Sequence, residues 1–162
     1  MSTLAVKKTS SKKEFGLSIL WYWLSYVVVT MIGIAHTIFN VAVLHMGSMA
    51  QGPGLGEGYE ATKPWHPLYN IILFTLFGYI YMRCVKNPTL KKAVHTGIFW
   101  AVISIVIDLV GWVLIDHSWS LTFKQFYIEY QPWITLVYLA MVAGPILGYL
   151  IYARKAKKEH TL

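Results

Sequence analysis

Four long apolar stretches constrain the fold of this chain more than any other feature. They cover about residues 15–46, 67–85, 94–115 and 132–152. A helix of about 20 apolar residues crosses the hydrocarbon core of a bilayer, whereas a lone strand cannot satisfy its backbone hydrogen bonds there. We therefore expect an all-α polytopic membrane protein, a four-helix transmembrane bundle that forms one domain over residues 1–162.

The composition agrees with burial in lipid. Charged residues make up 13 % of the chain and apolar residues 56 %, whereas a soluble domain carries about 25 % charged residues. A single cysteine, Cys84, excludes an intramolecular disulfide. The composition therefore predicts that the protein contacts the lipid bilayer.

The first apolar stretch is longer than one crossing requires. A helix of about 31 residues is roughly 46 Å long at 1.5 Å per residue. Aromatic residues favour membrane interfaces, and four of them suggest that the crossing itself begins near Leu24: Trp21, Tyr22, Trp23 and Tyr26. The stretch also exceeds the apolar core of a signal peptide, so we expect it to be retained.

The distribution of basic residues predicts the orientation. All but two of the 14 Lys and Arg residues lie in the N-terminal tail, in the loop 83–93 or in the C-terminal tail. The exceptions, Lys63 and Lys124, lie in the two other loops. Basic residues concentrate on the cytoplasmic side of membrane proteins, so we expect both termini to be cytoplasmic and the protein to reside in the cell membrane. No basic face with stacking aromatics accompanies the charge, which disfavours nucleic-acid binding.

The two loops predicted to face outward differ in character. The loop 47–65 is rich in Gly and Pro and should be irregular. The second loop carries aromatic residues at the spacing of an amphipathic helix: Trp119, Phe123, Phe126, Tyr127 and Tyr130. We expect this segment to lie flat on the outer surface as an interfacial helix with its aromatic face in the lipid.

The third apolar stretch carries one face of small residues that includes a carboxylate. The face follows steps of 3 and 4 residues: Gly97, Ala101, Ser104, Asp108 and Gly111. Small faces let membrane helices approach closely, so Asp108 should point at protein. A carboxylate inside a bilayer is costly and marks a functional site by default. Protonation, pairing with His36 or a bound cation would each lower that cost.

Three further polar residues lie near the predicted depth of Asp108. His36 and Asn40 share one face of the first stretch, and Asn70 follows at the start of the second. We predict an intramembrane polar site made of His36, Asn40, Asn70 and Asp108. The leading interpretation is a small protein for transport or for ion and proton handling through this site; structural hydrogen bonding by Asp108 is the alternative role for that residue.

Glycine faces suggest how the helices associate. Ala140, Gly144 and Gly148 repeat at steps of four in the last stretch, beside Pro145. The packing candidates of the third and fourth stretches are Gly97, Ala101, Gly111, Ala140, Gly144 and Gly148. These faces serve either packing within the chain or assembly into a homo-oligomer or a larger membrane complex. An accessory subunit that docks on such a complex is the first alternative function.

A second group of polar residues lies at the predicted outer rim: His45, His66, Asp116, His117 and Glu129. Imidazole and carboxylate groups bind Zn²⁺ or Cu²⁺, and His45 with His66 would be the axial pair for a haem. The second alternative is thus a membrane redox or metal-binding enzyme. Known enzyme motifs are absent from the sequence, so neither catalytic residues nor a cofactor can be assigned.

Overall fold

The computed structural model describes residues 11–48 and 55–159, and this part of the chain is all-α, without strands. Five α-helices follow one another: α1 (Ser11–Ala42), α2 (Glu57–Glu60), α3 (His66–Cys84), α4 (Leu90–Asp108) and α5 (Trp133–Glu159). A short 3₁₀ turn η2 and two π-helical segments complete the order: η2 (Lys63–Trp65), η3 (Leu109–Leu114) and η4 (Lys124–Ile128). The predicted fold class is confirmed at this level.

Within the described residues, three helical stretches are long and apolar enough to cross a membrane, which suggests membrane integration. They are Lys12–Ala42, Leu90–Leu114 and Trp133–Glu159, with mean hydropathies of 1.8, 2.2 and 2.0. Helix α3 is not among them, although it corresponds to the predicted crossing at 67–85. His66 and Asn70 in its first turns lower its hydropathy. The crossing of α3 therefore stays a prediction.

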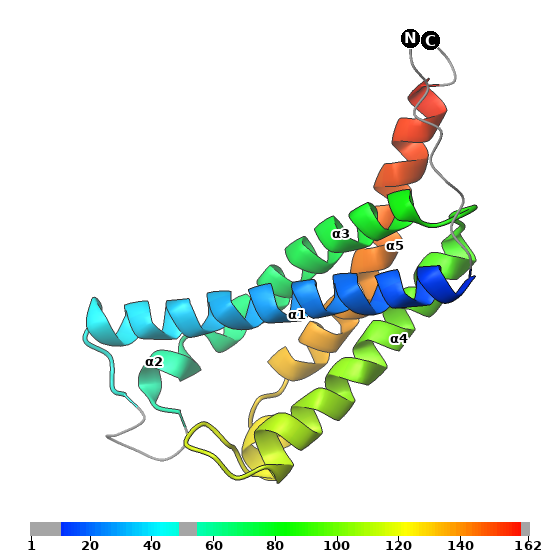
Figure 1. Cartoon of the computed structure of the whole chain (residues 1–162). Coiled ribbons are helices and arrows are strands. Elements are labelled where there is room, and N and C mark those ends of the chain that lie inside the picture. The colour runs from blue at the N-terminus through cyan, green and yellow to red at the C-terminus, as the bar shows by residue number, and fades with distance from the viewer. Residues whose placement is uncertain (1–10, 49–54, 160–162) are drawn as a thin grey trace.

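The four long helices run back and forth between two ends of the molecule. Figure 1 shows the start of α1, the end of α3, the start of α4 and the end of α5 at one end, with α2 at the other. The turn between α3 and α4 is tight because Asn87 adopts a left-handed conformation with φ of 51° and the Thr89 side chain caps α4. An ion pair of 2.9 Å between Lys92 and Glu14 ties this turn to the start of α1.

Helix α3 packs along α5 through glycines on both helices. A Cβ atom at Gly144 would lie 2.5 Å from the Cβ of Phe74, and one at Gly148 would lie 2.4 Å from the backbone nitrogen of Tyr79. In return, a Cβ at Gly78 would lie 2.7 Å from the Cα of Pro145. The absence of side chains at these positions brings the two backbones into contact.

Helix α4 packs against α5 through its small face. A Cβ at Gly97 would lie 2.3 Å from the carbonyl oxygen of Val142. Ala101, Ser104 and Asp108 on the same face are also buried. Gly111 differs, because a Cβ there would meet no atom within 4 Å. The close packing that the sequence predicts for Gly111 is therefore not formed.

An aromatic core fills the bundle between its two ends. Tyr22, Phe74 and Trp100 are fully buried and form one cluster. The Tyr22 hydroxyl forms a hydrogen bond of 3.0 Å with Ser104, and the Trp100 indole donates to the Ser18 hydroxyl at 3.0 Å. The polar atoms of Tyr22 and Trp100 are thus satisfied by other side chains of the bundle, as buried polar groups in folded proteins are.

The predicted interfacial helix is wrong for the segment between α4 and α5. Over residues 119–130 the helical element is the five-residue η4, and Phe126 and Tyr130 are buried against Leu55 and Ile134 rather than facing lipid. Phe123 does stay exposed, at 57 %. The spacing of an amphipathic helix does not distinguish an apolar face that covers protein from one that covers lipid, and here most of the face covers protein.

Candidate functional site

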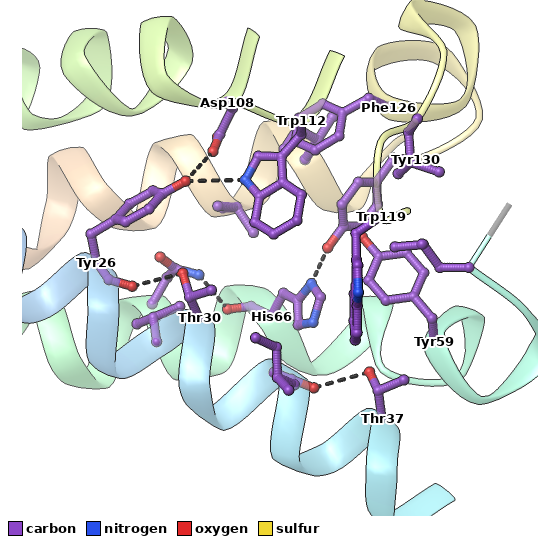
Figure 2. A pocket seen from close by; sticks show the side chains of 18 of the residues that line it. Tyr26, Thr30, Thr37, Tyr59, His66, Asp108, Trp112, Trp119, Phe126 and Tyr130 are labelled. Atoms are coloured by element: carbon purple, nitrogen blue, oxygen red, sulfur yellow. Dashed lines mark hydrogen bonds between the residues drawn. The ribbon is translucent and has the colours of Figure 1, made fainter. Parts of the chain in front are cut away.

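A cavity of about 130 Å³ lies at the α2 end of the bundle, beside the aromatic core. Side chains from all four long helices, from α2 and from the segment before α5 line it (Figure 2). Its wall is mostly aromatic and aliphatic, and the polar groups on it are few. The lining residues include Tyr26, Tyr59, His66, Asn70, Asp108, Trp112, Trp119, Phe126 and Tyr130.

Asp108 contributes the one carboxylate on the described cavity wall. The residue is 6 % exposed, and both of its carboxylate oxygens accept hydrogen bonds from hydroxyl groups. Tyr26 donates to Oδ1 at 2.6 Å and Tyr138 donates to Oδ2 at 2.9 Å. The Trp112 indole donates in turn to the Tyr26 hydroxyl at 3.2 Å, as Figure 2 shows. Within the described residues no basic side chain pairs with Asp108.

Aromatic rings form the outer rim of the cavity. Tyr59 and Tyr130 lie with their ring centroids 6.2 Å apart, and Phe126 packs on Tyr130 at 6.0 Å. Burial raises the pKa of the Tyr59 and Tyr130 hydroxyls above the usual value for tyrosine, so both hydroxyls stay protonated at neutral pH. The Lys63 ammonium lies 5.0 Å from the ring centroid of Tyr130 and is paired with Glu60 at 2.7 Å. The rim therefore already holds one ammonium group against an aromatic face.

The wall supplied by α3 carries two polar atoms without a protein partner. His66 and Asn70 lie one helical turn apart, and the Asn70 amide nitrogen donates to the His66 carbonyl at 2.8 Å. Nδ1 of His66 pairs with the Tyr130 hydroxyl (Figure 2). Nε2 of His66 and Oδ1 of Asn70 are buried and have no hydrogen-bond partner. Such atoms are rare in folded proteins.

The structure brings only part of the predicted polar site together. Asp108 and Asn70 line the cavity, whereas His36 and Asn40 do not. His36 accepts or donates a hydrogen bond of 2.6 Å with Tyr69, and the Asn40 amide donates to the Gly58 carbonyl at 2.9 Å. Pairing with His36, one of the three ways in which the cost of burying Asp108 could be lowered, is not formed; the hydroxyls of Tyr26 and Tyr138 bind the carboxylate instead.

Several residues of the cavity were missed by sequence reasoning. The aromatic run around Tyr26 predicts an interfacial position for that residue, Trp112 is not predicted as a site residue, and His66 is predicted among the rim histidines. Tyr138, which binds Asp108 without lining the cavity, is not predicted as a site residue either. A signal did exist for Trp112, which follows Asp108 by four residues and so shares its face of a regular helix. The tyrosines carry no such signal, because they come from other helices.

The predicted metal ligands do not form a cluster. Within the described residues, no group of three His, Cys, Asp or Glu side chains could hold a metal ion. His117 is bonded to the Gly111 carbonyl at 2.7 Å, and Asp116 accepts from Ser120 at 3.2 Å. Glu129 pairs with a lysine of its own segment. The outer His and Asp residues are thus engaged separately, and the predicted metal site is not assembled.

Comparisons with protein-family models, with curated proteins and with solved structures find no match to this chain.

Proposed function

We propose that this protein binds a small organic cation with an apolar body in the cavity at Asp108 and carries it across the membrane. One observation carries the proposal: a buried carboxylate lines an aromatic cavity, and tyrosine hydroxyls rather than a basic side chain hold it. A carboxylate in such surroundings lowers its free energy by gaining a cation.

The size and lining of the cavity favour a ligand of about one ring. An apolar cavity of about 150 Å³ accommodates benzene, and this cavity measures about 130 Å³. Aromatic faces attract cations, and ammonium groups are recognised by cages of such rings. Charge from Asp108 and ring faces from Tyr59 and Tyr130 act on the ligand together.

The packing of the helices supports four crossings. Helix α3 contacts α5 at Phe74, Gly78 and Tyr79, over more than one turn, so the two helices share one depth range. If α5 crosses the bilayer, α3 crosses beside it. The basic residues Lys86, Lys92 and the tail of α5 then lie at the cytoplasmic end, as the positive-inside rule requires, and the cavity opens on the outer side.

Transport from this cavity requires a second state. The buried cluster of Tyr22, Phe74 and Trp100 lies beside the cavity, and with both termini cytoplasmic it would separate the cavity from the cytoplasm, which corresponds to an outward-facing arrangement. A single carboxylate binds either a proton or a cation, and protonation of Asp108 would release the ligand. We therefore expect exchange of the cation for a proton.

Two observations favour this proposal over the two alternative functions. Docking as an accessory subunit through glycine faces would use surfaces that Gly97, Gly144 and Gly148 already bury within the chain. A metal-dependent redox function would need a ligand cluster that the described residues do not form.

The test compares ligands of matched size. Wild-type protein in lipid nanodiscs is titrated calorimetrically with benzylammonium, benzyl alcohol and benzoate. We expect the cation to bind at least tenfold more tightly than the alcohol and the anion, a difference of about 1.4 kcal/mol or more. Asp108→Asn should abolish this preference, because it keeps the shape of the side chain and removes the charge.

Asp116→Asn is the matched control. Asp116 is an exposed carboxylate at the same end of the molecule and does not line the cavity. Its replacement should leave the preference for the cation intact. Equal binding of benzylammonium by Asp108→Asn and by wild type would overturn the proposal.

A further inference from the structure

The part of the cavity wall that α3 supplies carries two buried polar atoms without a hydrogen-bond partner, and the cation site at Asp108 does not account for them. We propose that Asn70, together with His66, selects cations that carry N–H donors, so that the ligand is a primary or secondary ammonium rather than a quaternary one. This inference rests on the proposed function, because it names the class of cation that the same cavity binds.

The free atom of Asn70 is an acceptor, and its identity is fixed by the neighbouring hydrogen bond. The amide nitrogen lies 2.8 Å from the His66 carbonyl oxygen, which can only accept, so the side chain cannot be flipped. The remaining atom, Oδ1, is buried without a partner in a residue that is 2 % exposed. A ligand in the cavity that carries an N–H donor would satisfy it.

His66 offers a second position next to Asn70. Its Nε2 atom is also buried and unpartnered, and Nδ1 is engaged by Tyr130. An N–H donated to Nε2 would select the tautomer with its proton on Nδ1, which then donates to the Tyr130 oxygen. Gly33 lies against this atom, because a Cβ there would lie 3.3 Å from Nε2, so a larger residue at position 33 would crowd it.

A quaternary ammonium could satisfy Asp108 and the aromatic rim but not the α3 wall. It has charge and no N–H group, so its binding would cover Oδ1 of Asn70 with methyl groups and leave the acceptor unpaired. Sites built to hydrogen-bond a ligand discriminate strongly against analogues that lack the donor. The carboxylate thus provides affinity for charge, and Asn70 provides selectivity for the donor.

The test uses a methylation series in which every member is cationic. Benzylammonium, its N-methyl and N,N-dimethyl derivatives and benzyltrimethylammonium are titrated into the full-length protein in nanodiscs at pH 7. Wild type should bind the members with N–H donors at least tenfold more tightly than benzyltrimethylammonium. Asn70→Leu should bind the quaternary compound as tightly as wild type does and should lose the preference among the four.

Thr75→Val supplies the matched control. Thr75 lies further along α3 and also carries a buried hydroxyl without a partner, but it does not line the cavity. Its replacement should preserve the preference for N–H donors. If Asn70→Leu fails to fold, as judged by thermal unfolding, Asn70→Ala is measured in its place, since it removes the amide without adding methyl groups.

The two proposals fail in different ways. Equal affinity of wild type for all four cations, with benzyl alcohol binding weakly, would overturn the inference about Asn70 and leave the cation site standing. Absence of binding by every member of the series would overturn the proposed function and the inference with it. A preference for N–H donors that survives in Asn70→Leu would also refute the role given to Asn70.

Discussion

The contact between α4 and α5 depends on the missing side chain of Gly97. A Cβ at this position would lie 2.3 Å from the carbonyl oxygen of Val142 and 3.0 Å from its carbonyl carbon and its Cα. All three atoms belong to the backbone of α5, so no side chain can rotate away to make room. Gly97→Ala must therefore push the two helices apart.

The size of the effect follows from two opposing terms. Replacing Gly by Ala inside a helix stabilises it by roughly 0.5–1 kcal/mol. Overpacking of a close contact costs about 1–3 kcal/mol, and a backbone clash belongs at the upper end of that range. Gly16→Ala in α1 experiences only the first term, since a Cβ there meets no atom within 4 Å. The free energies of unfolding of the two variants should therefore differ by about 3 kcal/mol.

The measurement is unfolding of each purified variant by sodium dodecyl sulfate in mixed micelles, followed by circular dichroism. Gly16→Ala should be at least as stable as wild type, and Gly97→Ala should be clearly less stable. The loss should not depend on protein concentration, because the contact lies within one chain. A Gly97→Ala variant within about 0.5 kcal/mol of Gly16→Ala would refute the close approach of α4 and α5.

Two further predictions concern topology and the outer end. In a Cys84→Ser background, a cysteine introduced at Glu57 should be labelled by a membrane-impermeant reagent from the outside, and one introduced at Asn87 from the cytoplasmic side. Labelling of both positions from the same side would show that α3 does not cross. Asn40→Leu removes the buried hydrogen bond of 2.9 Å to the Gly58 carbonyl, which should cost about 1–3 kcal/mol. It should speed hydrogen exchange around α2, and unchanged exchange there would contradict the anchoring role of this amide.

The fold was largely predictable because its main signal is local. Long apolar stretches predict helices whatever they pack against, and steps of 3 and 4 residues placed Gly97, Ala101, Ser104 and Asp108 on one face, all of which are buried. The same rule failed at Gly111 because the helix becomes π-helical from Leu109. A π-helix has more residues per turn, so residues beyond that point rotate away from the face that the α-helical period assigns to them.

The polar site was less predictable because it depends on which faces meet. In α1 the cavity is lined by Tyr26, Thr30, Gly33 and Thr37, at steps of 4, 3 and 4. His36 precedes Thr37 by one residue and is therefore turned about 100° away, toward Tyr69. The sequence indicates how deep His36 lies along its helix. It does not indicate which face of α1 turns toward the cavity, because that depends on where α3 packs.

The tyrosines of the site show where composition misleads most. Tyr26 sits in an aromatic run that is typical of a membrane interface, yet its hydroxyl binds Asp108 inside the bundle. The carboxylate gives the better clue: a buried Asp without a basic partner must find hydroxyl or indole donors on the helices that face it. In this chain the donors are Tyr26 from α1 and Tyr138 from α5, joined through Tyr26 to Trp112. A search that starts from the buried carboxylate and asks which donors could reach it therefore finds aromatic residues that the statistics of membrane interfaces assign to the lipid boundary.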